Sequence, residues 1–289
     1  MQKIKYQLLD KFIQKEVSGK EIDFLLHISR YQSETGEVMG VYYKDICGQI
    51  GISHQTFYNI LEGLQKKGII TVTKNSEIDY DIRILDNDFS DKDFSSGYYN
   101  TSEDVFHSRS FRNLKTKEKI LFLDLYKILK SNKGHWMIES SNFYKRYTRL
   151  LNVTKKVLRG YLHSLKQFFQ VCRKRFKYYF AARKKLRTTG QGRRISDELT
   201  YNMNVIRSTC RRQKIKSYTE EELKDTSKLI TQYKDIAAFS GKQSIQLVVQ
   251  SLIDSIDIIN RYKRINEKRE FSLRPKLIHK VIKSRLKLA

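Results

Sequence analysis

Residues 1–85 contain apolar positions that repeat at helical spacing, interrupted by short β-favouring runs. The elements expected from this pattern follow the order helix, strand, helix, turn, helix and hairpin. Ser53 is positioned to cap the start of the third helix, and Gly68 is positioned to end it. The segments that give this order are an apolar stripe at Ile22, Leu25 and Leu26, a strand over 38–43, helices over 44–50 and 54–67, and hairpin strands over 69–73 and 78–85 joined by 74–76.

The same order of elements is predicted again after residue 113. When the segment from Gly51 is placed over the segment from Asn152, apolar positions coincide at a constant offset of 101 residues. Thr116 and Thr154 are expected to cap the first and third helices of this second copy. Its expected segments are helices over 117–130, 142–151 and 155–167, a strand over 136–138, and a hairpin of 168–172 and 176–181 around a tip of Arg173, Lys174 and Arg175.

This organisation predicts a mainly α fold with small β-hairpins, in which tandem winged-helix domains are followed by a small helical C-terminal domain. The stretch between the copies is polar and acidic without periodicity, which is typical of a linker that lets two domains hinge. A capping box from Thr219 to Glu222 opens the C-terminal region, and Pro275 begins its last helix. The expected division is winged-helix domain 1 at 1–85, an acidic linker at 86–113, winged-helix domain 2 at 114–182, a basic connector at 183–218 and a helical C-terminal domain at 219–289.

An apolar stripe in the C-terminal region has two interpretations. A stripe at i, i+3 and i+4 spacing is what a helix in a small bundle presents to its own domain core. The alternative is a homodimer interface, which would let two chains hold a palindrome or bridge two sites. The stripe consists of Ile245, Val248, Val249, Leu252, Ile253, Ile256 and Ile259.

The charge balance narrows the class of partner. The chain has 57 Lys and Arg against 31 Asp and Glu, a formal net charge of +26. So large a surplus on a folded chain favours a polyanion, and double-stranded DNA is the expected partner, ahead of a ribosome or a membrane surface. Between residues 172 and 216 there are fifteen Lys or Arg against two acids. This stretch is expected to contact phosphates, the alternative being a solvated tail.

Other classes of protein are disfavoured by what the sequence lacks. The three cysteines, Cys47, Cys172 and Cys210, are far apart, so neither a zinc site nor a disulfide framework is indicated. The N-terminal segment has no apolar leader, and no run approaches the ~20 apolar residues of a membrane span. We therefore expect a cytoplasmic protein, associated with a nucleoid or plasmid, that has no membrane partner.

Enzymatic activity, a cofactor and a metal are not expected. No glycine-rich phosphate loop or dinucleotide motif occurs in the chain. His27 and Arg30 have the HxxR spacing of tyrosine recombinases, but they fall in the first helix of the first copy, far from any catalytic segment. The aspartates at 86, 88, 91 and 93 lack the glycine and terminal glutamate of a calcium loop.

The third helix of each copy is the expected reader of DNA, because such a helix enters the major groove with its N-terminal residues against base edges. In the first copy its polar residues suit adenine and thymine, whereas the cations of the second copy suit guanine and phosphates. A solvated helix surface is the alternative. The candidate DNA-binding residues are Ser53, His54, Gln55, Thr56, Tyr58, Asn59 and Lys74 in the first copy, and Thr154, Lys155, Lys156, Arg159, His163, Lys166, Arg173, Lys174 and Arg175 in the second.

Residues 18–85 also resemble a known group of proteins. The resemblance is carried by the run GVYYKDICGQIGISHQTFYNILEGLQKKGIITV, which is similar to the winged helix of firmicute plasmid replication proteins and of MarR-like and DnaD-like regulators. Two winged helices followed by helical material resemble the iteron-binding plasmid initiators, whose two heads grip successive major grooves. The resemblance implies an origin-binding initiator of a plasmid or phage that contacts replication machinery. A transcriptional regulator at an operator, working with the transcription machinery, and a nucleoid or segregation protein are the alternatives.

Overall fold

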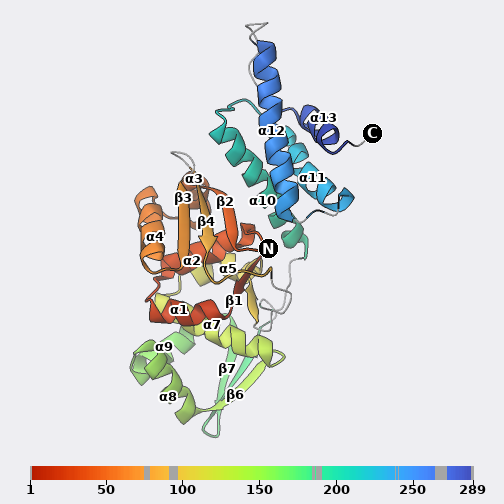
Figure 1. Cartoon of the computed structure of the whole chain (residues 1–289). Coiled ribbons are helices and arrows are strands. Elements are labelled where there is room, and N and C mark those ends of the chain that lie inside the picture. Colours follow the sequence, from red (N-terminus) through yellow and green to blue (C-terminus); the bar gives the residue numbers. More distant parts are fainter. Residues whose placement is uncertain are drawn as a thin grey trace.

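The computed structural model describes residues 2–74, 79–90, 97–183, 186, 191–237, 239, 241–263 and 272–287. The fold is mainly α with small antiparallel sheets, as predicted. Figure 1 shows an elongated molecule in three parts. The first unit, residues 19–84, lies in the middle, the second unit, residues 116–182, lies at one end, and the C-terminal bundle, residues 191–285, lies at the other.

The first unit has the predicted order of elements. Ser53 caps α4, because its side chain accepts a hydrogen bond from the Thr56 backbone nitrogen at 3.2 Å. Gly68, with φ +65°, lies just beyond the end of the same helix. The tip of the β3–β4 hairpin, 75–78, lies outside the described residues. The elements are α2 (Gly19–Ile28), η1 (Ser29–Tyr31), β2 (Glu37–Tyr42), α3 (Tyr43–Ile50), α4 (His54–Lys66), β3 (Ile70–Lys74) and β4 (Asp79–Ile84), with the sheet in the order β2-β4-β3.

The second unit repeats this topology. The backbone is left-handed at Gly51 (φ +70°) and at Asn152 (φ +47°), so the turn before the third helix recurs at the offset of 101 residues. Thr154 caps that helix through a hydrogen bond from the Val157 backbone nitrogen at 3.4 Å. The elements are α7 (Thr116–Ser131), β6 (His135–Glu139), α8 (Ser140–Leu151), α9 (Lys155–Leu165), β7 (Phe169–Lys174) and β8 (Lys177–Ala182), with the sheet in the order β6-β8-β7.

The acidic linker predicted over 86–113 is wrong for most of its length. Its second half forms β5 (Tyr98–Asn100), α5 (Asp104–His107) and α6 (Arg109–Arg112), and β5 pairs with the N-terminal strand β1 (Lys3–Lys5), which precedes α1 (Gln7–Gln14). Among its many polar residues this segment has several apolar side chains, and these are buried in the core that the two units share. The segment 91–96 lies outside the described residues. The buried apolar set includes Tyr99, Val105, Phe106 and Phe111.

The two units are not hinged, contrary to the prediction. Lys119, in α7, is buried and reaches Asp23 in α2, with 2.6 Å between Nζ and Oδ2. Thr116 was expected to cap α7, but Lys115 is the N-cap, and the Thr116 hydroxyl accepts a hydrogen bond from the Gly19 backbone nitrogen at 2.9 Å. The polar atoms at the start of α7 therefore join α2 to α7, and apolar side chains of both units belong to one continuous core.

The basic connector predicted over 183–218 is mostly a helix. It contains α10 (Gln191–Arg212), which packs against β2 and against the rest of the bundle. Residues 184, 185 and 187–190 lie outside the described residues. The connector prediction failed because a basic run can also form a helix whose cations face carboxylates of the same chain.

The remaining helices of the bundle are α11 (Glu220–Ile236), α12 (Gly241–Lys263) and α13 (Pro275–Arg285). The Thr219 capping box and Pro275 in the first turn of α13 are confirmed. Val248 and Leu252 of the apolar stripe are fully buried within the single chain. This burial agrees with the interpretation of the stripe as part of a domain core.

Candidate nucleic-acid interface

The N-terminal half of α4 carries a row of aromatic rings beside its candidate base-reading residues. The His54 ring lies 4.2 Å from the Tyr43 ring of α3 and 4.7 Å from the Tyr58 ring, measured between centroids. Tyr58 in turn lies 6.2 Å from Tyr80 of β4. Burial, followed by a hydrogen bond with Tyr58, raises the pKa of Tyr80 to about 12. These contacts join α3, α4 and the hairpin into one surface.

Gln55 and Asn59 are both exposed on α4 and are bonded to each other. The Gln55 Nε2 donates to the Asn59 Oδ1 at 2.9 Å, across one turn of the helix. The bond leaves an amide oxygen on Gln55 and an amide nitrogen on Asn59 for other partners. An acceptor beside a donor matches the N6 and N7 positions of adenine in the major groove. Asn59 and Gln55 can therefore act as one pre-arranged reading pair.

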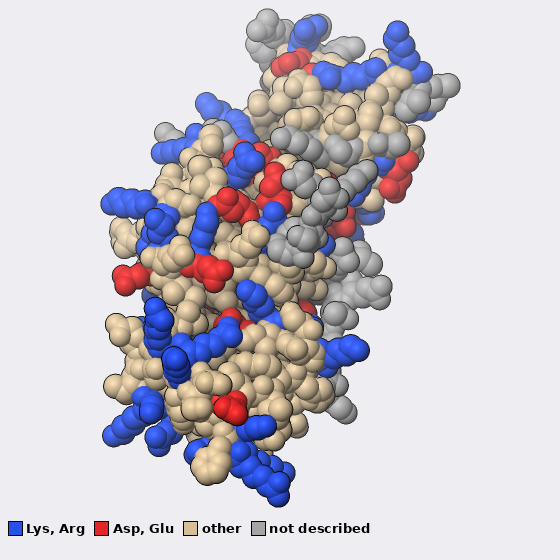
Figure 2. Space-filling view, turned by 60° about the horizontal axis from the view of Figure 1, so that its bottom comes forward, with Lys and Arg blue, Asp and Glu red and all other residues tan. Residues whose placement is uncertain are grey.

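The corresponding surface of the second unit is cationic. Lys155, Lys156 and Arg159 are exposed on α9, at the positions that His54, Gln55 and Tyr58 occupy on α4. Lys166, just beyond the end of the same helix, and His163 are also exposed. Figure 2 brings this end of the molecule forward, and Lys and Arg side chains project along its lower edge.

A pair of tyrosines lies beneath these cations. The hydroxyls of Tyr144, in α8, and Tyr178, in β8, are hydrogen-bonded at 2.7 Å. Lys155 lies over the Tyr144 ring, with 5.9 Å from Nζ to the centroid, within the range of a cation–π contact. Burial and the bond to Tyr144 raise the pKa of Tyr178 to about 12, and the charges of Arg173 and Arg159 oppose that rise. The start of α9 and the hairpin therefore form one basic surface.

The tip of the second hairpin differs from the prediction. Arg173 and Lys174 belong to β7, and the two-residue tip consists of Arg175 and Phe176. The Arg173 Nε donates to the Ser140 hydroxyl at 3.3 Å, at the start of α8. Lys174 and Arg175 are exposed, as is Lys74 at the equivalent end of β3 in the first unit. Ser53, Thr56 and Thr154 act in helix capping, since Ser53 and Thr154 accept backbone bonds and Thr56 bonds to Ser53 at 2.8 Å.

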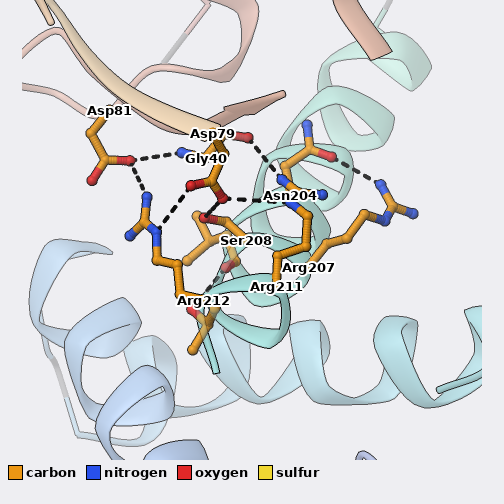
Figure 3. A network of polar contacts seen from close by, with 10 residues as sticks. Gly40, Asp79, Asp81, Asn204, Arg207, Ser208, Arg211 and Arg212 are labelled. Carbon is orange, nitrogen blue, oxygen red and sulfur yellow. Dashed lines mark hydrogen bonds and ion pairs between the residues drawn. The ribbon is translucent and has the colours of Figure 1, made fainter. Parts of the chain in front are cut away.

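Three arginines expected among the phosphate contacts of the basic connector have partners inside the protein. Arg212 donates to Asp81 at 2.7 Å and Arg211 lies 3.5 Å from Asp79, which also accepts a hydrogen bond from Ser208 at 2.7 Å. Asp79 is fully buried by these contacts. Figure 3 shows Ser208, Arg211 and Arg212 of α10 pointing toward the sheet of the first unit. Arg207 likewise pairs with Glu220 at 3.0 Å.

Gly40 allows this close approach of α10. It has φ +66° at an irregularity in β2, and a Cβ there would lie 2.4 Å from the Cβ of Ser208. Its backbone nitrogen donates to Asp81 at 2.8 Å, and its oxygen accepts from Arg211 at 3.3 Å. Arg211 and Arg212 of α10 therefore hold the C-terminal bundle against the first unit.

A cavity of about 220 Å³ lies where α2 and α3 meet α5 and α6, and His27, Arg30, Gln49 and Arg112 are among the residues that line it. Burial lowers the pKa of His27 to about 3, and its Nε2 is a buried atom without a hydrogen-bond partner in the described part of the chain. Burial also raises the pKa of Asp23 to about 6, against the pull of Lys119. Within the described ranges, no three His, Cys, Asp or Glu residues are grouped to hold a metal ion.

Sequence reasoning predicted Tyr58 at this interface. It missed four further tyrosines and a phenylalanine, which are Tyr43, Tyr80, Tyr144, Tyr178 and Phe176. Tyr43 and Tyr144 are separated by the same 101 residues as the two turns, so the repeat itself contained the signal for this pair. Tyr80 and Tyr178 are the second residues of β4 and β8. Phe176 was placed inside a strand, because a phenylalanine is unusual in a tight turn.

Comparison with protein-family models, with curated proteins and with solved structures finds no match for this chain. Across the described residues, no helix combines the length and the apolar character that a membrane span requires. An inference about function therefore depends on the geometry and the charge of the two units.

Proposed function

We propose that the first and second units are winged helices and that the protein binds double-stranded DNA through both of them. The observation that carries this proposal is the repeat itself. In each unit a capped third helix exposes polar side chains beside a hairpin, with tyrosines joining the two. A helix exposed in this way fits the major groove, and a hairpin beside it can reach the backbone. The net charge of +26 supports a polyanionic partner.

The two units have different roles in this proposal. Gln55 and Asn59 read bases, because their amides form a donor–acceptor pair and carry no charge. Lys155, Lys156 and Arg159 chiefly bind phosphates and guanine edges, which adds affinity that depends on salt. Specificity is thus expected mainly from the first unit and affinity mainly from the second.

Selection of binding sites from a random duplex library, followed by fluorescence anisotropy at several salt concentrations, tests the proposal. Replacing Gln55 and Asn59 with Ala should lower discrimination between sites by about 1–3 kcal/mol per lost bidentate contact and spare nonspecific affinity. Replacing Lys155, Lys156 and Arg159 with Ala should weaken binding to all duplexes and flatten the salt dependence. An equal loss of specificity from both sets would contradict the division of roles, and absence of duplex binding would refute the proposal as a whole.

A matched control is available on the far part of the molecule. Lys228 is exposed on α11 and pairs with Asp225 at 2.8 Å. Replacing Lys228 with Ala removes one positive charge without touching either unit. This variant should bind duplex DNA as the unaltered protein does.

We further propose that the bound DNA is the replication origin of a plasmid or phage. Support comes from the resemblance of residues 18–85 to plasmid replication proteins. Immunoprecipitation of the bound DNA from cells tests this role, because an initiator would be recovered on repeats at an origin. Recovery on an inverted repeat at a promoter would indicate a transcriptional regulator instead, and an even distribution would indicate a nucleoid or segregation protein.

A further inference from the structure

The tip of the β7–β8 hairpin has an unusual composition for its backbone geometry. Lys174 pairs with Lys177, so only Arg175 and Phe176 form the turn, and both are left-handed, with φ +43° and φ +64°. Two-residue turns with two left-handed positions usually contain Asn and Gly, because larger side chains crowd the backbone in that conformation. The turn therefore holds an arginine and a phenylalanine in positions that favour much smaller residues.

Phe176 is also the most exposed of the large apolar side chains in the described part of the chain. It is 82% exposed, so its ring contributes little of the stabilisation that burial would provide. The residue also has an unfavourable backbone conformation. Its carbonyl oxygen accepts a hydrogen bond from the Ser140 backbone nitrogen at 2.7 Å. The tip is thus anchored to the start of α8, and the ring is held outward. Unfavourable geometry maintained by the surrounding fold is typical of functional positions.

The charged side chains around the Phe176 ring indicate the kind of surface that the tip would contact. Lys174 and Arg175 are exposed next to Phe176, and Lys177 follows it. Positive side chains around an apolar ring match a surface with negative edges and an apolar interior. A DNA duplex offers this combination where a base step opens, since phosphates border the groove and the apolar faces of the two unstacked bases become accessible between them. DNA is favoured over an anionic bilayer because Arg173 of β7 and Arg159 of α9 both lie near Tyr178, so that a duplex bound by α9 would pass beside the hairpin that carries the tip.

We propose that Phe176 is a wedge that enters a base step of the duplex bound by the second unit and unstacks it. This inference rests on the proposed DNA binding and adds to it a distortion at one defined step. The flanking cations hold the two phosphate backbones while the ring is inserted. Insertion of an apolar side chain between base pairs kinks the duplex and lets more of the protein surface reach it.

The test uses the full chain and duplexes that carry 2-aminopurine at successive positions of the selected site. This base brightens when it is unstacked, and saturating protein makes the signal report the bound complex. The unaltered protein should raise the fluorescence several-fold at one step. Phe176→Ala should remove the rise and weaken binding, and Phe176→Leu should retain part of it. Tyr179→Ala is the matched control, since Tyr179 is a 40% exposed aromatic residue of the same hairpin and should leave the rise unchanged.

Phe176→Gly separates folding from function. Glycine relieves the left-handed position, so this variant should have a higher Tm than the unaltered protein and yet give no fluorescence rise. Duplex binding without any rise in the unaltered protein, or an undiminished rise with Phe176→Ala, would overturn the wedge and leave the proposed function intact. Failure of the unaltered protein to bind any duplex would overturn both. Binding to vesicles of phosphatidylcholine and phosphatidylglycerol that is lost with Phe176→Ala would assign the ring to a lipid surface and refute the wedge.

Discussion

Replacement of His27 by Gln should make the stability of the protein less sensitive to acid. His27 is only 5% exposed, and burial is the largest cause that lowers its pKa from 6.5 to about 3. Below pH 6.5 His27 is therefore protonated in the unfolded chain, whereas in the folded chain it stays neutral until the pH approaches 3. A group with a depressed folded pKa stabilises the fold above its unfolded pKa, and this contribution is lost as the pH falls toward its folded value. Glutamine does not titrate, so the variant lacks this loss.

The size of the effect follows from the two pKa values. Each pH unit below 6.5 costs about 1.4 kcal/mol, so the step from pH 8 to pH 5 should cost about 2 kcal/mol. Asp23 acts in the opposite direction, because its pKa is raised to about 6 and its protonation favours the fold over the same interval. The unaltered protein therefore shows only the difference between the two effects. Comparing it with the variant at each pH cancels the contribution of Asp23.

Urea unfolding followed by circular dichroism at pH 8 and at pH 5 measures this difference. The free energy of unfolding of His27→Gln, taken relative to that of the unaltered protein, should rise by about 2 kcal/mol from pH 8 to pH 5. Any loss of packing in the variant lowers both values equally and does not affect this change. His163→Gln, which removes an exposed histidine of α9, is the control. A difference between His27→Gln and the unaltered protein that stays constant with pH would refute the assignment of His27 as a buried neutral group.

Other contacts lead to further expectations. Lys119→Ala should lower the free energy of unfolding by about 3–5 kcal/mol, because it leaves the Asp23 carboxylate buried without its partner; a loss below about 1 kcal/mol in urea unfolding would argue against a buried ion pair. Asp79→Ala should release α10 from the first unit and speed proteolysis within the C-terminal bundle, whereas Asp225→Ala, at an exposed pair, should not; equal cleavage of both variants would contradict this. Because the two units share a core, inserting about ten base pairs, one helical turn, between their half-sites should reduce affinity to that of one unit; a hinged protein would tolerate the insertion.

The repeat and the caps of its two third helices could be predicted from sequence because they depend on local rules. The left-handed turns at Gly51 and Asn152 and the caps at Ser53 and Thr154 involve residues a few positions apart, and the structure has them where the sequence predicts them. The mainly α fold with small sheets was predictable for the same reason. Helical and strand periodicities arise within single segments.

Contacts between distant segments could not be predicted in this way. The segment 97–114 reads as polar, but Phe106 and Phe111 fill space that exists only when α2 and α7 meet. Arg211 and Arg212 look like phosphate ligands in the sequence, because their partners Asp79 and Asp81 lie more than a hundred residues away. A count of charged residues in the sequence gives the net charge, but it does not show which cations form ion pairs within the protein. The same limit hid the wedge candidate, since its exposure depends on where the turn falls.

The unequal charge of the two units has a consequence for the order of events in binding. The cationic second unit lies at the end of the elongated molecule opposite the C-terminal bundle, so the attraction to the proposed DNA partner should be strongest there. Encounters should begin at this end and proceed at a rate that falls as salt is added. The neutral amides of α4 would be brought to the bases only afterwards, and they would then determine how long the complex lasts. Search and recognition would thus be performed by two different units that share one core.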